Sequence, residues 1–266
     1  MKKTHSRKGP LIMGILNITP DSFSDGGKFM TLEEATKQAK KLIEEEADIL
    51  DIGGESTGPN SKFVTEKEEL SRVIPVIKAI REFSDIPISI DTYKANVALA
   101  AIQNGADMIN DVTAMREDQK MADVVKKHRC PIIMMYSKDN SPRTTIKEKK
   151  YPNVMQTIKK FLEERIAYAK SKGIKRDQII LDPGMGQFIS KIPHYSFEII
   201  AKLQELEIFK KPILIGISRK SFLQEDLSLR EEKAKTLSAI AYINGANIIR
   251  THDVGKLRDY LNLICQ

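Results

Sequence analysis

Short runs of apolar and β-branched residues alternate along the chain with longer segments in which apolar residues recur every three or four positions. Side chains repeat with period 2 in a strand and 3.6 in a helix, so the short runs predict strands and the longer segments predict amphipathic helices. Strands are predicted at Leu11–Asn17, Ala47–Gly53, Pro87–Asp91, Asp107–Asp111, Pro131–Tyr136, Gln178–Asp182, Pro212–Ser218 and Asn247–Thr251. Helices are predicted at Thr31–Glu46, Glu66–Phe83, Ala95–Asn104, Asp118–His128, Val154–Lys172, His194–Glu207, Arg230–Asn244 and Val254–Cys265.

This regular order of strand and helix predicts the fold class. Strands that alternate with helices form a parallel sheet, and eight such units favour an α/β fold closed into a (β/α)8 TIM barrel over an open doubly wound sheet. The chain has 266 residues, close to the roughly 250 of one such barrel, so we expect a single domain over residues 1–266. The polar interval Ser137–Pro152 is expected to be a mobile loop.

Composition excludes several classes of partner. The net charge of +7 comes from lysines scattered among glutamates, and the sequence has no Trp. A nucleic-acid surface would need a basic stripe interleaved with aromatic residues, so we expect no nucleic acid as partner. No apolar run approaches the roughly 20 residues of a membrane span, and no signal-peptide pattern follows the basic N-terminus. We expect no membrane association and a cytoplasmic location, with Cys130 and Cys265 structural.

Polar side chains gather where the predicted strands end, which is where a (β/α)8 barrel builds its active site. Seven of the eight strands end this way, at Asn17, Asp51 to Thr57, Asp91, Asn110 and Asp111, Asp182 to Gly186, Ser218 to Ser221, and Arg250 to His252. An Asp at a strand end is often only a turn or a helix cap, and Asp111 and Asp253 are interpreted so. Convergence of the other residues on one rim favours a binding site.

Hydrogen-bond acceptors come from strands three, four and six. Asp91, Asn110 and Asp182 offer oxygen acceptors together with one amide. This set suits the edge of a guanine-like ring, which presents a ring N–H and an exocyclic amine. A buried Asp is costly without donors, and a ligand that donates two hydrogen bonds to Asp182 would offset that cost.

Cations come from strands seven and eight, where such barrels often bind phosphate. Lys220, Arg250 and His252 suit an anion, and the last two, being two apart on an extended strand, lie on one face and suit one diphosphate. We therefore expect the acceptors on one side of the rim and the cations on the other. A heterocycle beside a diphosphate indicates substitution at a carbon that bears diphosphate, with electrostatic stabilisation of the departing group.

Oxygen ligands for a metal lie near the end of the first strand. Asn17 ends that strand, and Asp21 and Asp25 follow in a loop that is longer than most strand-to-helix connections. Carboxylate and amide oxygens suit Mg²⁺, especially an ion that is shared with a diphosphate. The sequence therefore predicts Mg²⁺ as cofactor, with Asn17 as a ligand.

Seven motifs carry a resemblance to a known family. They are ILNITPDSFSDGG, DIGGEST, SIDT, IND, LDPGMG, SRKSF and RTHDV, in this order over nearly the whole chain, and together they resemble dihydropteroate synthase, the sulfonamide target of folate biosynthesis. The resemblance implies a transferase that joins 6-hydroxymethyl-7,8-dihydropterin diphosphate to p-aminobenzoate and releases diphosphate and 7,8-dihydropteroate. It also implies a homodimer formed through the late helices.

The same resemblance implies roles for individual residues. Asp91, Asn110, Asp182 and Lys220 would hold the pterin. Asn17, Arg250 and His252 would hold the diphosphate and Mg²⁺. Ser218, Thr57 and Gly186 would contribute to substrate binding, with Ser218 and the first two loops framing the p-aminobenzoate site. The residues expected to act in catalysis are Asp91, Lys220, Arg250 and His252.

Several positions depart from the family pattern. Gly58 stands where the family usually has Arg, so either Lys62 or another cation substitutes for that guanidinium or activity is low. The fifth strand ends Met135-Tyr136 instead of Met-His, and Gly186–Ser190 differs from the usual Gly-Phe-Gly-Lys run. The LDPGMG, SRKSFL and RTH segments look like those of the divergent, drug-insensitive synthases. We expect the altered segment Gly186–Ser190 to weaken sulfonamide binding relative to p-aminobenzoate.

Two alternatives remain open at the level of sequence. A pterin-dependent methyltransferase of the same barrel type would share Asp91, Asn110 and Asp182. It has no use for a diphosphate clamp, so the pair of Arg250 and His252 argues against it. The second alternative is a catalytically weak pterin-binding paralogue, which is motivated by Gly58. Diphosphate release from the two substrates separates both alternatives from a synthase.

Overall fold

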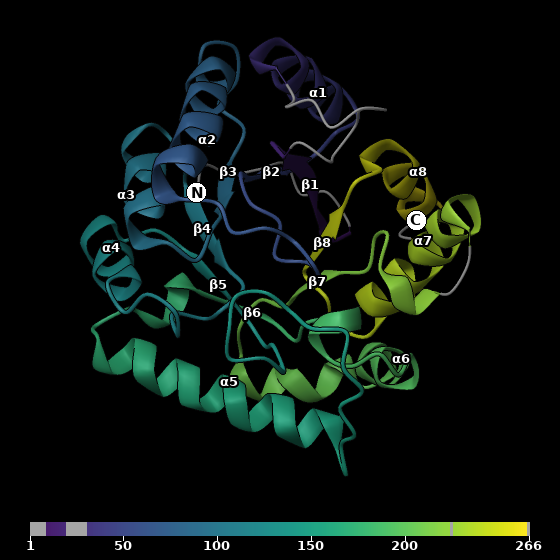
Figure 1. Ribbon diagram of the computed structural model, residues 1–266. Helices are drawn as coiled ribbons and strands as arrows, with labels where there is room; N and C mark the ends of the chain where they lie inside the picture. Colours follow the sequence, from purple (N-terminus) through teal and green to yellow (C-terminus); the bar gives the residue numbers. More distant parts are fainter. Residues whose placement is uncertain (1–8, 20–30, 224–225, 265–266) are drawn as a thin grey trace.

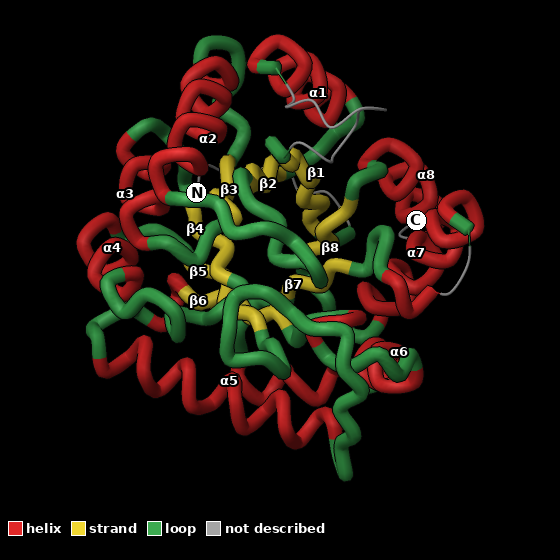
Figure 2. The backbone as a smooth tube through the Cα atoms, in the orientation of Figure 1, coloured by secondary structure: helices red, strands yellow, loops and turns green. Residues whose placement is uncertain are grey.

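The computed structural model describes residues 9–19, 31–223 and 226–264. The strands are β1 (Leu11–Asn17), β2 (Ile49–Gly53), β3 (Ile88–Asp91), β4 (Met108–Asp111), β5 (Ile132–Met135), β6 (Ile179–Asp182), β7 (Leu214–Gly216) and β8 (Ile248–Thr251). The α-helices are α1 (Leu32–Glu44), α2 (Glu66–Arg81), α3 (Ala95–Gln103), α4 (Met121–His128), α5 (Val154–Ser171), α6 (His194–Ala201), α7 (Leu227–Ile243) and α8 (Val254–Ile264). Figures 1 and 2 show the helices arranged around the ring of parallel strands, which confirms the predicted (β/α)8 barrel.

The ring has one thin junction. The strand order is β6-β5-β4-β3-β2-β1-β8-β7, and all pairs are parallel. Between β6 and β7 the described sheet has an isolated bridge, Leu181 with Ile213, where the Leu181 N–H donates to the carbonyl of Pro212 at 2.9 Å. The other neighbouring strands share longer ladders, so the barrel is least supported by backbone hydrogen bonds at this junction.

Alternation along the strands divides the barrel interior into two layers. Inward side chains recur at every second residue of a strand. The lower layer is apolar and consists of Met13, Ile49, Ile133, Ile180, Leu214 and Ile248. Two residues further along β2, β5, β6, β7 and β8, the corresponding positions are Asp51, Met135, Asp182, Gly216 and Arg250. The apolar layer thus seals one end of the barrel and leaves the polar residues at the carboxyl ends of the strands.

Register brings these strand ends to one level. Parallel pairing aligns residues from strands that are distant in sequence, and the pairs at this level are Gly53 with Asp91, Asp91 with Asn110, Met135 with Asp182, and Gly216 with Arg250. Outside the ring, a continuous apolar cluster joins the strands to the inward faces of the helices. The helices therefore hold the ring in the register that assembles the polar rim.

Three helices differ in their bounds from the prediction, and one of them is α4, which begins at Met121 instead of Asp118. α6 is shorter than the predicted helix His194–Glu207, and a 3-10 segment over Leu203–Phe209 follows it. α7 begins at Leu227 instead of Arg230, because the side chain of Asp226 accepts a main-chain hydrogen bond and caps the helix. The remaining helices lie where the apolar periodicity predicts them, within the fraying expected at helix ends.

The β5–α5 loop, residues 137–152, was expected to be mobile and is instead fastened to the barrel. The ammonium group of Lys138 is buried and lies 2.9 Å from Thr144 Oγ1. The Tyr151 hydroxyl donates to the carbonyl of Ile189 at 2.7 Å. A polar composition is typical of mobile loops, but here most of the polar groups have partners within the protein.

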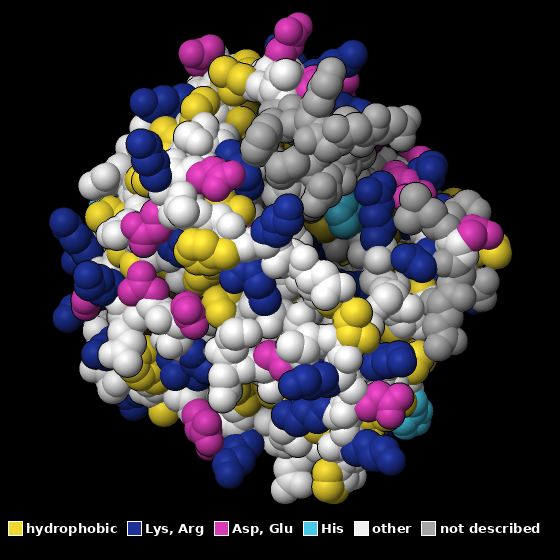
Figure 3. Space-filling model, viewed as in Figure 1, with side chains coloured by type: hydrophobic (Ala, Val, Ile, Leu, Met, Phe, Trp, Pro, Cys, Tyr) yellow, Lys and Arg dark blue, Asp and Glu magenta, His cyan; other side chains and the backbone are white. Residues whose placement is uncertain are grey.

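Composition-based expectations can be compared with the surface and the core. On the face shown in Figure 3, Lys and Arg side chains are spread among acidic ones and do not form a stripe. Cys130 is buried, and burial raises the pKa of its thiol to about 11, as suits a structural residue. Cys265 lies outside the described residues. Among the helices of the described ranges, none is long and apolar enough to cross a membrane.

Candidate active site

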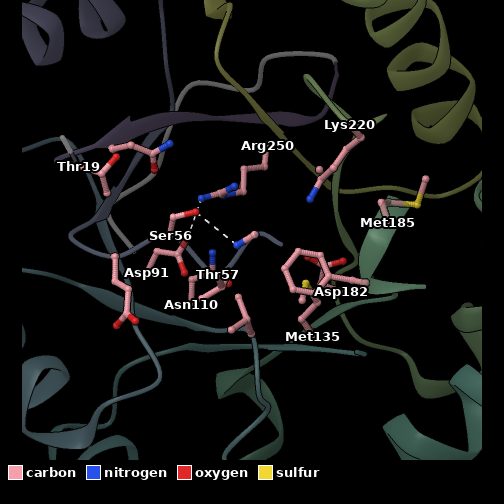
Figure 4. Close-up of a pocket in the computed structure, with 16 residues that line it drawn as sticks. Thr19, Ser56, Thr57, Asp91, Asn110, Met135, Asp182, Met185, Lys220 and Arg250 are labelled. Carbon is pink, nitrogen blue, oxygen red and sulfur yellow. Dashed lines mark hydrogen bonds and ion pairs between the residues drawn. The ribbon is translucent and has the colours of Figure 1, made fainter. Parts of the chain in front are cut away.

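A cavity of about 350 Å³ opens at the carboxyl ends of the strands. Its lining consists of Asn17, Thr19, Glu55, Ser56, Thr57, Gly58, Asp91, Asn110, Val112, Met135, Asp182, Met185, Phe188, Gly216, Lys220 and Arg250. Seven of the ten residues with a predicted role in the site are among them: Asn17, Thr57, Asp91, Asn110, Asp182, Lys220 and Arg250. Figure 4 shows the Lys220 and Arg250 side chains extending toward the middle of the cavity, so the predicted rim is assembled.

Arg250 links two carboxylates on the floor of this cavity. Its Nε donates to Asp51 Oδ2 at 2.6 Å, and one terminal nitrogen donates to Asp91 Oδ2 at 2.7 Å. Asp51 is fully buried, and it also accepts a hydrogen bond from the Asn110 amide at 3.1 Å. The prediction that acceptors and cations occupy opposite sides of the rim is therefore wrong. Buried carboxylates need a cation nearby, and Arg250 provides it.

Two carboxyl groups of the floor titrate close to neutral pH. Burial raises the pKa of Asp91 to about 7, with a further contribution from the charge of Asp51, while Arg250 opposes the shift. Burial likewise raises the pKa of Asp182 to about 6, against the opposing effects of the Gly184 N–H and a nearby ammonium group. A ligand that donates hydrogen bonds to Asp182 would favour its ionised form.

Lys220 places an ammonium group between these acids. Its pKa is lowered to about 8 by burial and by the charge of Arg250, while Asp182 and Asp91 hold it up. The group therefore remains a cation at neutral pH. It also lies 4.9 Å from the centre of the Phe188 ring, within the range of a cation–π contact. Lys220 can thus serve as a donor to a ligand that fills the cavity.

Ser218 and His252 lie together, outside the lining of the cavity. The Ser218 hydroxyl accepts the main-chain N–H of His252 at 3.3 Å and lies 3.0 Å from Nδ1 of its ring. Because the hydroxyl accepts that N–H, we assign its own proton to a hydrogen bond with Nδ1, which leaves the ring proton on Nε2. Burial and the charges of Arg219 and Arg250 lower the pKa of His252 to about 3, so the imidazole is neutral.

The expected pairing of Arg250 with His252 is consequently not seen in the described cavity. Arg250 is engaged with Asp51 and Asp91, whereas His252 is held by Ser218 beyond the end of β8. The two residues follow the two-residue alternation that the sequence predicts, but the buried carboxylates draw the guanidinium toward the barrel axis. Sequence alone did not reveal this, because it gave no partner for Asp51.

Gly186 supports the site without lining it. It begins the 3-10 segment Gly186–Phe188, and its φ of +62° lies in the left-handed region that favours glycine. A Cβ at this position would lie 3.5 Å from Cβ of Lys220. The Gly186 N–H donates to the hydroxyl of Ser196 at 3.0 Å. Gly186 therefore packs against the stem of Lys220.

The sequence interpretation missed part of the lining. Val112, Met135 and Phe188 pack together and form an apolar wall beside the polar floor. Met135 and Phe188 had been noted only as departures from the family pattern, and Asp51 had received no role. The signal for Asp51 was the period of two along β2, since it lies two residues before Gly53 and hence on the same face.

Two aspartates were interpreted as local caps, and both predictions are confirmed. Asp111 accepts the N–H of Thr113 at 2.8 Å with one oxygen and that of Met115 at 2.7 Å with the other. Asp253 accepts the N–H of Lys256 at 3.4 Å, in the first turn of α8. Both carboxylates thus satisfy main-chain donors, as expected of local caps.

Donors for a metal are few in the described part of the site. In residues 9–19, 31–223 and 226–264, no three His, Cys, Asp or Glu side chains are grouped so as to hold a metal ion. Asn17 lines the cavity, whereas the predicted ligands Asp21 and Asp25 lie outside the described residues. A single amide oxygen suits a Mg²⁺ ion that keeps several waters and takes further ligands from substrate phosphates.

Comparison with known proteins identifies the class to which this site belongs. Residues 13–252 match the family model described as pterin binding enzyme. The chain belongs to this family of pterin-binding enzymes.

Individual relatives show which enzymes of this family the chain resembles. The dihydropteroate synthase of Clostridium beijerinckii is 45% identical over 248 residues, which cover 91% of this chain and 88% of the relative. The crystal structure of the Clostridium difficile dihydropteroate synthase, solved in the presence of pteroic acid, has a TM-score of 0.87 and 40% identity, and covers 96% of this chain and 95% of that one. The structure of the Xanthomonas albilineans dihydropteroate synthase with 4-aminobenzoic acid has a TM-score of 0.88 and 38% identity, and covers 96% of this chain and 92% of that one. Within the family, the chain belongs to the dihydropteroate synthases, which are transferases of folate biosynthesis.

The departure at Gly58 is visible in the structure. Gly58 lines the cavity, and a Cβ built there would meet only Ser56 Oγ, at 3.5 Å, so the position has room for a side chain. Lys62, which was named as one cation that could substitute for the missing Arg, is not among the lining residues. Within the described ranges, Lys220 and Arg250 are the cations that face the cavity.

Proposed function

We propose that this synthase joins 6-hydroxymethyl-7,8-dihydropterin diphosphate to p-aminobenzoate, forming 7,8-dihydropteroate and diphosphate. The observation that carries the proposal is the cavity of about 350 Å³ in which Asp182, Asn110 and Lys220 converge beside an apolar wall. Related synthases have been solved with pteroic acid and with 4-aminobenzoic acid, which contain the two halves that such a cavity would join.

The floor is suited to a pterin. Asp182 offers two oxygens to the ring N–H and exocyclic amine, and these donors would favour the ionised carboxylate, whose pKa burial raises to about 6. The Asn110 amide and the Lys220 ammonium group supply donors for the ring nitrogens and the carbonyl. The ring would lie against Val112 and Met135 of the apolar wall, while Phe188, in the loop after β6, would face the arylamine.

The chemistry is a substitution at the carbon that bears the diphosphate. The arylamine nitrogen forms a bond to this carbon while the carbon–oxygen bond breaks, and the diphosphate leaves with the electron pair. The excess amine proton passes to water. An arylamine is uncharged at neutral pH, so no strong base is needed, and the protein acts by placing the two substrates and stabilising the departing anion. Lys220, Arg250 and the Nε2–H of His252 would provide that stabilisation, with Asp91 holding Arg250 in place.

Mg²⁺ is proposed as the cofactor. The oxygen of Asn17 would hold it at the edge of the cavity, and when bound it supplies positive charge to the diphosphate oxygens. We expect a chelator to lower diphosphate release more than tenfold and added Mg²⁺ to restore it, whereas Ca²⁺ should restore less because it prefers longer bonds and more ligands. Release that is unaffected by the chelator would count against the metal.

The decisive experiment uses the purified protein with both substrates. Diphosphate release is followed by a coupled assay, and dihydropteroate is identified by mass spectrometry. If the protein is the proposed synthase, diphosphate and dihydropteroate should form in equal amounts, and only when p-aminobenzoate is present. Methyl transfer without diphosphate would favour the methyltransferase alternative, and tight pterin binding without turnover would favour a binding paralogue.

We further propose that the protein is a cytoplasmic homodimer that binds sulfonamides weakly. Support for the dimer comes from exposed apolar side chains on the two last helices: Leu229, Ile240, Ile243, Leu263 and Ile264. Ile243→Glu should convert a dimer to a monomer, as measured by light scattering, while Lys233→Glu on the same helix should not. Support for weak sulfonamide binding comes from the altered segment Gly186–Ser190. The test is the ratio of the sulfonamide inhibition constant to the p-aminobenzoate KM, which should be higher for this protein than for the Clostridium beijerinckii enzyme.

A further inference from the structure

Two walls of the cavity are built from loops. The β2 wall, residues 55–58, follows β2, and the β6 wall, residues 185–188, follows β6. These segments have no strand ladder to hold them at a fixed separation. In Figure 1 the teal β5–α5 loop crosses in front of the barrel near the blue segment that follows β2. This loop, residues 137–152, contacts both walls and is called the strap below.

The strap holds the β2 wall through one main-chain hydrogen bond and one ion pair with a buried carboxylate. The Thr144 N–H donates to the carbonyl of Thr57 at 3.1 Å. The guanidinium of Arg143 forms an ion pair with Glu55, and it also donates to the carbonyl of Lys62 at 3.3 Å. These contacts join the strap to residues that precede it by more than 80 positions in the sequence.

The same strap holds the β6 wall. The ammonium group of Lys138 donates to the carbonyl of Gln187 at 2.5 Å, and the main-chain N–H of Lys138 donates to the carbonyl of Phe188 at 2.8 Å. The hydroxyl of Thr144 lies 2.8 Å from the same Gln187 carbonyl. Phe188, which faces the cavity, is therefore positioned through its own main chain.

The ion pair on the β2 side is balanced in charge. Glu55 also accepts from the Tyr93 hydroxyl and is paired with Lys94, whose ammonium group is shared with the buried Glu69 at 2.5 Å. Two carboxylates thus meet two cations, one of which is Arg143. Removing the Arg143 charge would leave a buried negative charge in excess, which is strongly unfavourable. The strap is therefore part of the structure of the β2 wall.

Thr144 joins the two walls by itself. Its side chain is buried, its N–H binds the β2 wall, and its hydroxyl binds the β6 wall. We propose that the strap sets the separation of the two walls, and that Thr144 and Arg143 are positioning residues for the arylamine substrate. The inference rests on the proposed function for the identity of that substrate. The pterin acceptors lie on strands β3, β4 and β6, which the strap does not hold.

The test compares two hydroxyl deletions in the same loop. Thr144→Val removes a hydroxyl that reaches both Asp139 and the β6 wall, and Thr145→Val removes one that reaches Asp139 alone, within the strap. We expect Thr144→Val to raise the KM for p-aminobenzoate about tenfold, to leave the dissociation constant of the pterin within about twofold, and to be rescued by Thr144→Ser. Thr145→Val should change neither value by more than about twofold.

Hydrogen exchange gives a readout that does not depend on activity. In Thr144→Val, amides of both walls should exchange faster than in the wild type, whereas in Thr145→Val only strap amides should. If exchange of the two walls is unchanged, or if Thr145→Val has the same effect as Thr144→Val, the strap does not position them. Loss of pterin binding equal to the loss of arylamine binding would also overturn the inference. A wild-type protein that releases no diphosphate contradicts the proposed function instead, and leaves the exchange result to decide on the strap.

Arg143 provides a second, independent arm. Arg143→Met should raise the KM for p-aminobenzoate and speed exchange in residues 55–58 with little change in residues 185–188. Arg143→Lys keeps the charge next to Glu55 and should restore most of both properties. If Arg143→Met is folded by its melting temperature and has wild-type exchange in the β2 wall, the ion pair with Glu55 has no positioning role.

Discussion

The floor of the cavity and its walls are held by different kinds of contact. On the floor, Asp91 and Asn110 extend from the neighbouring strands β3 and β4, and Arg250 extends from β8; the ladders of the sheet fix the level of all three. On the walls, Thr57 and Phe188 belong to loops, and contacts from the strap hold them. The floor is therefore as rigid as the sheet, whereas the walls depend on a few side chains from a distant loop. This difference predicts that changes on the floor affect folding and pterin binding together, and that changes on the walls affect one substrate selectively.

The largest effect is expected from Arg250→Met. Removing the guanidinium leaves Asp51 and Asp91 without their cation on a buried floor, so the free energy of unfolding should fall by about 3 kcal/mol. Urea denaturation measures it. The double variant Arg250→Met with Asp51→Asn removes one of the stranded charges and should recover part of the loss. A single variant as stable as the wild type would show that the floor does not depend on this ion pair.

Lys220→Met should have the next largest effect. It removes a buried donor but keeps most of the side-chain volume, so the pterin dissociation constant should rise by about tenfold or more while the protein remains folded. Calorimetric titration measures the constant. Lys78→Met, on the exposed face of α2, is the matched control and should bind as the wild type does. Equal binding by both variants would remove Lys220 from the pterin site.

The pH dependence of pterin binding sharpens the role of Asp182. Its carboxyl group has a pKa of about 6 in the free protein, and the ring donors need the ionised form. Above this pH the carboxylate is present and binding is strong. Below it, a proton must be lost before binding, so the dissociation constant should rise about tenfold for each further unit. Asp182→Asn should bind weakly without this dependence; a dependence that persists in the variant would place the titrating group elsewhere.

The smallest effect is expected on a wall. Phe188→Leu keeps an apolar side chain of similar reach but removes the flat ring, so the KM for p-aminobenzoate should rise about threefold, with pterin binding changed by less than about twofold. Steady-state kinetics with each substrate varied in turn separates the effect on p-aminobenzoate from the effect on the pterin substrate. If pterin binding falls more than arylamine binding, the division between floor and wall does not hold at Phe188.

Sequence was sufficient to locate four polar residues of the cavity, because the period of two along each strand is a local property. The apolar runs located the strands, and their polar ends identified Asp91, Asn110, Asp182 and Lys220 as neighbours in space. Sequence did not reveal the Asp51 and Arg250 pair, because residues 199 positions apart were joined only by closure of the barrel. It also misjudged the strap, because a polar loop that binds the protein has the same composition as one that binds water.

The thin junction between β6 and β7 has a consequence for ligand binding. Asp182 stands at the end of β6, and Lys220 follows β7, so they lie on either side of the Leu181 bridge. A ligand that contacts both side chains bridges the β6–β7 junction and adds to the few hydrogen bonds that close the barrel there. Occupancy of the cavity is therefore coupled to closure of the cylinder itself.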